Sequence, residues 1–143
     1  MVDQRYKYSE ETGIIIGLAM EVHCQLGNGF QEVIYQRALE IEFINNQIPF
    51  KREFDIPIIY KGHEIGSRRV DFLIYEKISV ELKALIKLEP VHFAQAINYL
   101  EAYNLEIGLL INFGNSSLEF KRLLNKKMSE KNLINPNKIS EIQ

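Results

Sequence analysis

Two carboxylates and a lysine fall within two neighbouring apolar segments. In segment 78–84 every second residue is apolar, and Glu81 and Lys83 both occupy the other set of positions. On an extended strand these two side chains therefore point to the same face. Asp71 interrupts the preceding apolar segment, 69–75, in the same way. Because only two residues separate the segments, a tight antiparallel hairpin would place Asp71 beside Glu81.

This group of charges suits phosphodiester hydrolysis. Two adjacent carboxylates repel each other unless a pKa rises or a divalent cation lies between them. Magnesium prefers one or two carboxylates with water and phosphate oxygens, and a nearby lysine can orient a water or offset charge on phosphorus. Alternatively, Glu81 and Lys83 form a surface salt bridge worth less than about 1 kcal/mol. We favour the chemical interpretation because the charges interrupt two otherwise apolar segments.

Helices and strands that would hold this group follow from apolar periodicity and capping residues. Helices are expected at 9–26, at about 31–46 and at 90–103. The apolar side of the second helix should consist of Ile34, Ala38, Ile41 and Phe43 or Ile44. Strands are expected at 50–60, 69–75, 78–84, 107–113 and 117–124. Pro57 indicates that the first strand is an edge strand or carries a bulge, because proline cannot donate a ladder hydrogen bond. This order predicts an α/β protein with a mixed sheet.

Composition is that of a single globular domain in a reducing compartment. The chain has 143 residues, of which 46% are hydrophobic and 25% are charged. The single cysteine excludes an intramolecular disulfide framework, and the three histidines lack zinc-ligand spacing, so oxygen atoms must bind any metal. The longest apolar run, 13–20, is shorter than the roughly 18 residues of a membrane span. We therefore expect a cytoplasmic protein with no membrane contact.

Charge is distributed unevenly along the chain. The formal net charge is −2, with −6 in residues 1–120 and +4 in residues 121–143. This balance argues against a protein that mainly coats nucleic acid. We expect a flexible N-terminus at 1–8, one folded domain at 9–124 and a basic, flexible tail at 125–143.

Several motifs together resemble one known family. The spacing from Asp71 to Glu81-Leu82-Lys83 resembles the PD-(D/E)XK nuclease superfamily. GFQEVIY at 29–35 matches the motif of its GxxExxY proteins. Similarity extends to YKGHEIG at 60–66, RRVDFLI at 68–74, VELKAL at 80–85, HFAQAINYL at 92–100, IGLLINFG at 107–114 and LEFKRL at 118–123. Val70 stands where the superfamily name has proline, a residue that many members lack.

The resemblance implies a restriction-endonuclease-like fold, in which helices flank a mixed central sheet. It implies that Asp71 and Glu81 bind Mg²⁺ or Mn²⁺, that Glu32 joins them, and that Lys83 assists the attacking water. Gln95 and Tyr99, one helical turn apart, would position Lys83 or contact nucleic acid.

The sequence leaves alternatives open for the partner and for the activity. DNA or RNA is the expected partner, and Arg68 and Arg69 could steer phosphate toward the site or be solvated charges. The rival to a nuclease is a noncatalytic module that binds nucleic acid or protein and keeps the nuclease fold. A requirement for a protein partner and the oligomeric state stay open.

Overall fold

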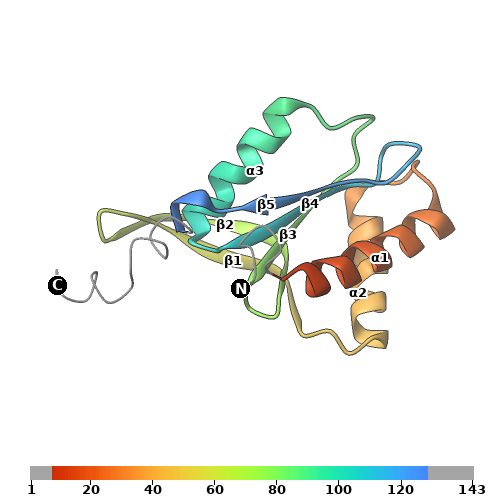
Figure 1. The fold of residues 1–143 in the computed structure, drawn as a ribbon, viewed down its shortest axis with the longest axis horizontal. Coiled ribbons are helices and arrows are strands. Elements are labelled where there is room, and N and C mark those ends of the chain that lie inside the picture. The colour runs from red at the N-terminus through yellow and green to blue at the C-terminus, as the bar shows by residue number, and fades with distance from the viewer. Residues whose placement is uncertain (1–7, 129–143) are drawn as a thin grey trace.

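A mixed sheet of five strands lies between two helical layers in the computed structural model, which describes residues 8–128 (Figure 1). The spatial order is β1-β2-β3-β4-β5; β3 and β4 are parallel, and the other neighbours are antiparallel. Along the chain the elements are α1 (Ser9–Leu26), α2 (Glu32–Asn45), β1 (Phe50–Tyr60), β2 (His63–Ile74), β3 (Ile78–Lys83), α3 (Pro90–Tyr103), β4 (Ile107–Asn112) and β5 (Glu119–Leu124). The expected α/β fold with a mixed sheet flanked by helices is confirmed.

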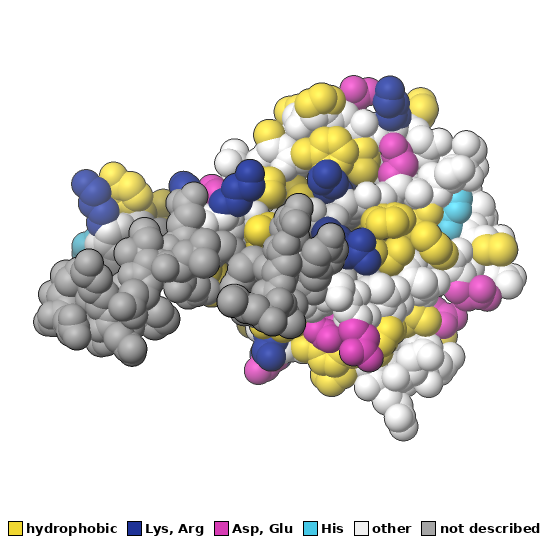
Figure 2. Space-filling view, in the orientation of Figure 1, with side chains coloured by type: hydrophobic (Ala, Val, Ile, Leu, Met, Phe, Trp, Pro, Cys, Tyr) yellow, Lys and Arg dark blue, Asp and Glu magenta, His cyan; other side chains and the backbone are white. Residues whose placement is uncertain are grey.

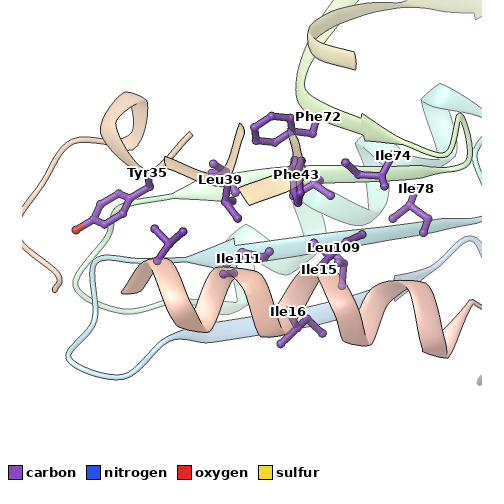
Figure 3. Close-up of a cluster of buried hydrophobic side chains, with 14 of the residues drawn as sticks. Ile15, Ile16, Tyr35, Leu39, Phe43, Phe72, Ile74, Ile78, Leu109 and Ile111 are labelled. Atoms are coloured by element: carbon purple, nitrogen blue, oxygen red, sulfur yellow. The ribbon is translucent and has the colours of Figure 1, made fainter. Parts of the chain in front are cut away.

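Helices α1 and α2 cover one face of the sheet and enclose the main core (Figure 3). Tyr35, Leu39 and Phe43 of α2 are fully buried. The predicted apolar side of this helix is confirmed for Ala38 and Phe43, which pack in the core, and is wrong for Ile41 and Ile44, which are 57% and 61% exposed. Apolar residues lie on more than one side of α2, so hydrophobicity alone could not identify the face that meets the sheet.

Helix α3 covers the opposite face (Figure 1). Its residues Ala96 and Leu100 pack with Leu110 of β4 and Leu123 of β5. Because both faces of the sheet are covered here, all six residues of β4 are buried, which fits the continuous apolar run of its sequence.

A hairpin of β1 and β2 extends from the body as an arm, at the left of Figure 1. Its turn lies at Lys61 and Gly62, whose φ angles are 48° and 81°. β1 is an edge strand with a register shift between Ile58 and Ile59, which confirms the interpretation of Pro57. β2 begins six residues earlier than expected, at His63, because pairing with β1 compensates for a polar sequence that has little apolar alternation.

Strands β2 and β3 pair over only a short length and then separate. Their ladder contains three residue pairs and ends at Phe72 and Val80. Beyond it, Val70 belongs to the apolar cluster of Leu73 and Tyr103 on the α3 side, whereas Phe72 belongs to the main core, although simple alternation would place Val70 and Phe72 on one face. The separation forms a fork whose walls carry the charged residues.

The described chain continues a few residues past β5. Asn125 is buried, donates a hydrogen bond to the Leu105 carbonyl (2.9 Å) and accepts one from the Met128 amide (3.2 Å). Most of the predicted flexible tail, at 129–143, and the first seven residues lie outside the described residues. Within residues 8–128, none of the helices combines the length and apolarity that a bilayer crossing requires.

Candidate functional site

The carboxylate of Glu81 is buried beneath α3. Its side chain is on the α3 side of β3, where its Oε1 accepts a 2.9 Å hydrogen bond from the Tyr103 hydroxyl. Burial raises the pKa of Glu81, although the Tyr103 bond opposes the rise, and the neighbouring Asp71 adds to it. The sequence analysis missed Tyr103, which continues the i, i+4 row of Gln95 and Tyr99 along the helix and could have been found from that spacing.

Asp71 lies in the fork between β2 and β3. Because the ladder has ended, its Oδ2 accepts the Leu82 amide hydrogen at 2.7 Å. Its Oδ1 accepts a hydrogen bond from the Gln36 amide of α2 at 3.0 Å. Burial raises the pKa of Asp71, and these two bonds together with Lys83 oppose the rise. Gln36 was also missed; it lies one helical turn after Glu32, and that spacing is the signal that could have identified it.

Lys83 ends β3 and Glu32 begins α2, and both carry charges close to Asp71. Burial raises the pKa of Glu32; the ammonium of Lys83 lowers it, and the charge of Asp71 raises it further. Lys83 forms no direct ion pair with any residue in 8–128. Its ammonium group therefore acts on three carboxylates through space and can still bind water or substrate.

A small pocket opens beside this group under α3. Gln95 and Tyr99 line it together with Glu81, Lys83 and Arg68. The guanidinium carbon of Arg68 lies 3.6 Å from the centre of the Tyr99 ring, and its buried Nε has no hydrogen-bond partner in the described part of the chain. This stacking fixes a positive charge at the pocket wall.

The other predicted arginine is not brought to the pocket. The Arg69 Nε donates to Asp55 across the arm at 3.2 Å, and both side chains are more than half exposed. The structure thus gathers Glu32, Asp71, Glu81, Lys83, Arg68, Gln95 and Tyr99 around the fork.

The donor set of the fork consists of carboxylate oxygens. Among residues 8–128, no three His, Cys, Asp or Glu side chains are close enough to form a metal group by themselves. Magnesium takes only one or two protein carboxylates and fills its other positions with water and phosphate, so the pair Asp71 and Glu81 fits such an ion. The arrangement also places a lysine where a developing negative charge could be offset.

Ionisation of the half-buried Asp71 and the buried Glu81 should destabilise the folded protein when no divalent metal is present. Since the pKa values of these two carboxyls are raised in the folded state, the stability gained from the bound protons is complete below the unfolded-state pKa. It is lost as the pH rises through the raised values. We expect the Glu81→Gln variant, which keeps an acceptor for Tyr103, to melt about 3 °C or more above wild type at pH 7.5 in EDTA.

Thermal unfolding followed by circular dichroism measures the difference in melting temperature between Glu81→Gln and wild type. This difference should shrink as the pH falls toward the ordinary pKa of a carboxyl group. A difference of equal size at acidic and neutral pH would contradict the assignment, because packing alone would then explain it.

Comparison with known proteins gives three results. A model of the PD-(D/E)XK nuclease superfamily matches residues 9–123. The fold is similar to the crystal structure of SSO0001, with a TM-score of 0.52 and 17% sequence identity, over 91% of this chain and 69% of that chain. At this identity the likeness concerns the fold alone. No curated protein matches.

Proposed function

The chain belongs to the PD-(D/E)XK nuclease superfamily, and on that premise we propose that it is a metal-dependent nuclease of the GxxExxY type. The observation that carries the proposal is the fork, where the half-buried Asp71 and the buried Glu81 lie near a lysine that forms no direct ion pair within residues 8–128. Burying like charges is costly unless they bind a cation. A divalent ion would relieve that cost, which explains why the fold tolerates the arrangement.

The residues of the fork fit Mg²⁺ or Mn²⁺. Asp71 and Glu81 would bind the ion, and Glu32, at the start of α2, would support them. When bound, such an ion supplies a polarised water and neutralises charge on the scissile phosphate. The Asp71 carboxylate is held by its two hydrogen bonds and Glu81 by Tyr103, so both are oriented before substrate arrives.

The remaining residues would handle the water and the phosphate backbone. Lys83 orients the attacking water in line with the leaving oxygen of the phosphodiester and offsets charge on phosphorus. Gln95 and Tyr99 position Lys83 or contact the nucleic acid, and Arg68 steers phosphate into the pocket they line. Arg69 could bind phosphate only by giving up its Asp55 partner. The single cysteine fits a reducing, cytoplasmic setting.

One observation favours a second candidate, a noncatalytic binding module. On the face shown in Figure 2, basic side chains lie mainly across the middle, and acidic side chains lie above and below them. Residues 1–120 carry a net charge of −6, which gives weak electrostatic attraction to a phosphate backbone. Such a module would bind nucleic acid or a protein partner with no cleavage.

The test is cleavage of labelled single- and double-stranded DNA and RNA by the purified protein. We expect cleavage in Mg²⁺ or Mn²⁺, none in EDTA, and a loss of about 100-fold or more in Asp71→Asn. Calorimetry with Mn²⁺ should show binding to wild type that the variant loses. Cleavage that persists in Asp71→Asn would reveal a contaminant, whereas a folded protein that neither cleaves nor binds Mn²⁺ would favour the binding module.

A further inference from the structure

The loop between β3 and α3 is held rigidly on both sides of its tip. Asn112, fully buried, accepts from the Leu85 amide (2.8 Å) and donates to the Leu85 carbonyl (2.9 Å). Glu119 accepts from the Leu88 amide at 3.0 Å. Between these fixed points Ile86 is 89% exposed, three residues after Lys83. An apolar side chain is thus presented to solvent by a restrained backbone at the edge of the fork.

The loop between α1 and α2 presents a second apolar side chain in a similar way. The Tyr35 hydroxyl donates to the Gly27 carbonyl (2.6 Å) and accepts from the Phe30 amide (3.1 Å). Its ring stacks on Phe113 with centres 4.5 Å apart. Phe30 itself is 48% exposed and precedes Glu32 by two residues. The buried Tyr35 thus holds the loop in shape, whereas the Phe30 ring in the same loop is exposed to solvent.

These two loops meet the β4–β5 loop at one end of the sheet (Figure 1). Gly114 packs against the backbone of Ala84 and Leu85 so closely that a Cβ atom would clash there. The next residue, Asn115, accepts a hydrogen bond from His23 of α1 at 2.9 Å through its carbonyl oxygen. Asn28 of the α1–α2 loop also donates to the Gly114 carbonyl at 3.5 Å. Phe30 and Ile86 thus stand on two loops that both contact the β4–β5 loop, and we call these two side chains the apolar rim.

We propose that the apolar rim contacts unpaired nucleobases, so that the substrate is single-stranded nucleic acid or a strand with an unpaired end. This inference rests on the proposed nuclease function. Apolar side chains can pack on a nucleobase only where its face is accessible, and in a duplex the faces are covered by neighbouring base pairs. Lys87 follows Ile86 directly in the sequence and would meet the adjoining phosphate, which a protein partner would not require.

The charge of the protein supports the same conclusion. With −6 over residues 1–120, phosphate contacts alone give little affinity. Stacking of a base on an aromatic side chain is worth about a tenfold to hundredfold change in affinity. Base contacts with the apolar rim would supply the affinity that phosphate contacts alone do not give.

The experiment measures binding of one labelled oligonucleotide, single-stranded or as a blunt duplex, by fluorescence anisotropy in Mg²⁺. The full chain carries Lys83→Ala to limit cleavage. Phe30→Ala and Phe30→Leu should weaken binding of the single strand by about tenfold and leave duplex binding unchanged. Ile86→Ser should act in the same direction with a smaller effect. Ile44→Ser is the control, because Ile44 is 61% exposed on α2 and is not part of the rim.

Several results would overturn the proposed role of the apolar rim. Equal affinity of the parent for single strand and duplex, or no effect of the Phe30 variants, would overturn the apolar rim while leaving the nuclease proposal intact. Absence of any nucleic-acid binding by the parent would overturn both. If Phe30→Ala instead abolishes self-association and leaves oligonucleotide affinity unchanged, the rim is a protein interface and the inference is wrong.

Discussion

Replacing Lys83 by alanine should lower the cleavage rate by about 100-fold or more while Mn²⁺ affinity stays equal to wild type or becomes tighter. The ammonium lowers the pKa values of Glu32, Asp71 and Glu81 by favouring their charged forms. It therefore also repels a cation that these carboxylates would bind, and its removal cannot weaken metal binding electrostatically. Its contribution to the reaction is to orient water and offset charge, which is typically worth about 10² to 10⁴ in rate.

Single-turnover cleavage and calorimetric Mn²⁺ titration separate the two effects. Lys121→Ala serves as the matched control, since Lys121 is exposed on β5 and has no role in the proposed site. A parallel loss of Mn²⁺ affinity and rate in Lys83→Ala would mean that Lys83 supports the fold of the site. An unchanged rate would remove it from the reaction.

The charged group could be predicted from sequence because it follows from local periodicity. Alternation along 78–84 places Glu81 and Lys83 on one face, and the structure puts both of them at the pocket under α3. Alternation does not explain how Asp71 joins the same group. The β2–β3 ladder ends at Phe72, the neighbour of Asp71, and the Asp71 carboxylate accepts the Leu82 amide hydrogen in place of a further backbone pairing.

Helical spacing marks Tyr103 and Gln36 as candidates, but the carboxylates that they contact could not be predicted because those partners are distant in sequence. Tyr103 lies 22 residues from Glu81, and Gln36 lies 35 residues from Asp71. Both contacts depend on how a helix crosses the sheet, which apolar periodicity leaves undetermined for α2. The motif at 29–35 has a physical explanation only in the fold: Glu32 faces the charge of Lys83, and Tyr35 closes the preceding loop.

The contact between Gln36 and Asp71 is expected to tune metal binding. Arg52 of β1 donates its Nε hydrogen to Gln36 Oε1 at 3.0 Å. Because arginine can only donate, this bond turns the amide nitrogen of Gln36 toward Asp71. The amide then donates to Oδ1 at 3.0 Å, and the Leu82 amide fixes the other oxygen. Gln36 is only 5% exposed, so no water readily replaces its contribution.

Gln36→Met removes this donor while keeping a side chain of similar length, and it should weaken Mn²⁺ affinity by about tenfold to a hundredfold. Calorimetry measures the affinity, and circular dichroism verifies the fold. Glu40→Ala is the matched control, since it removes another partner of Arg52 and leaves the amide contact in place. Arg52→Met should weaken Mn²⁺ binding in the Gln36 protein but add little in Gln36→Met, because Arg52 acts through that amide. Additive losses would show instead that Arg52 acts on Asp71 by another route.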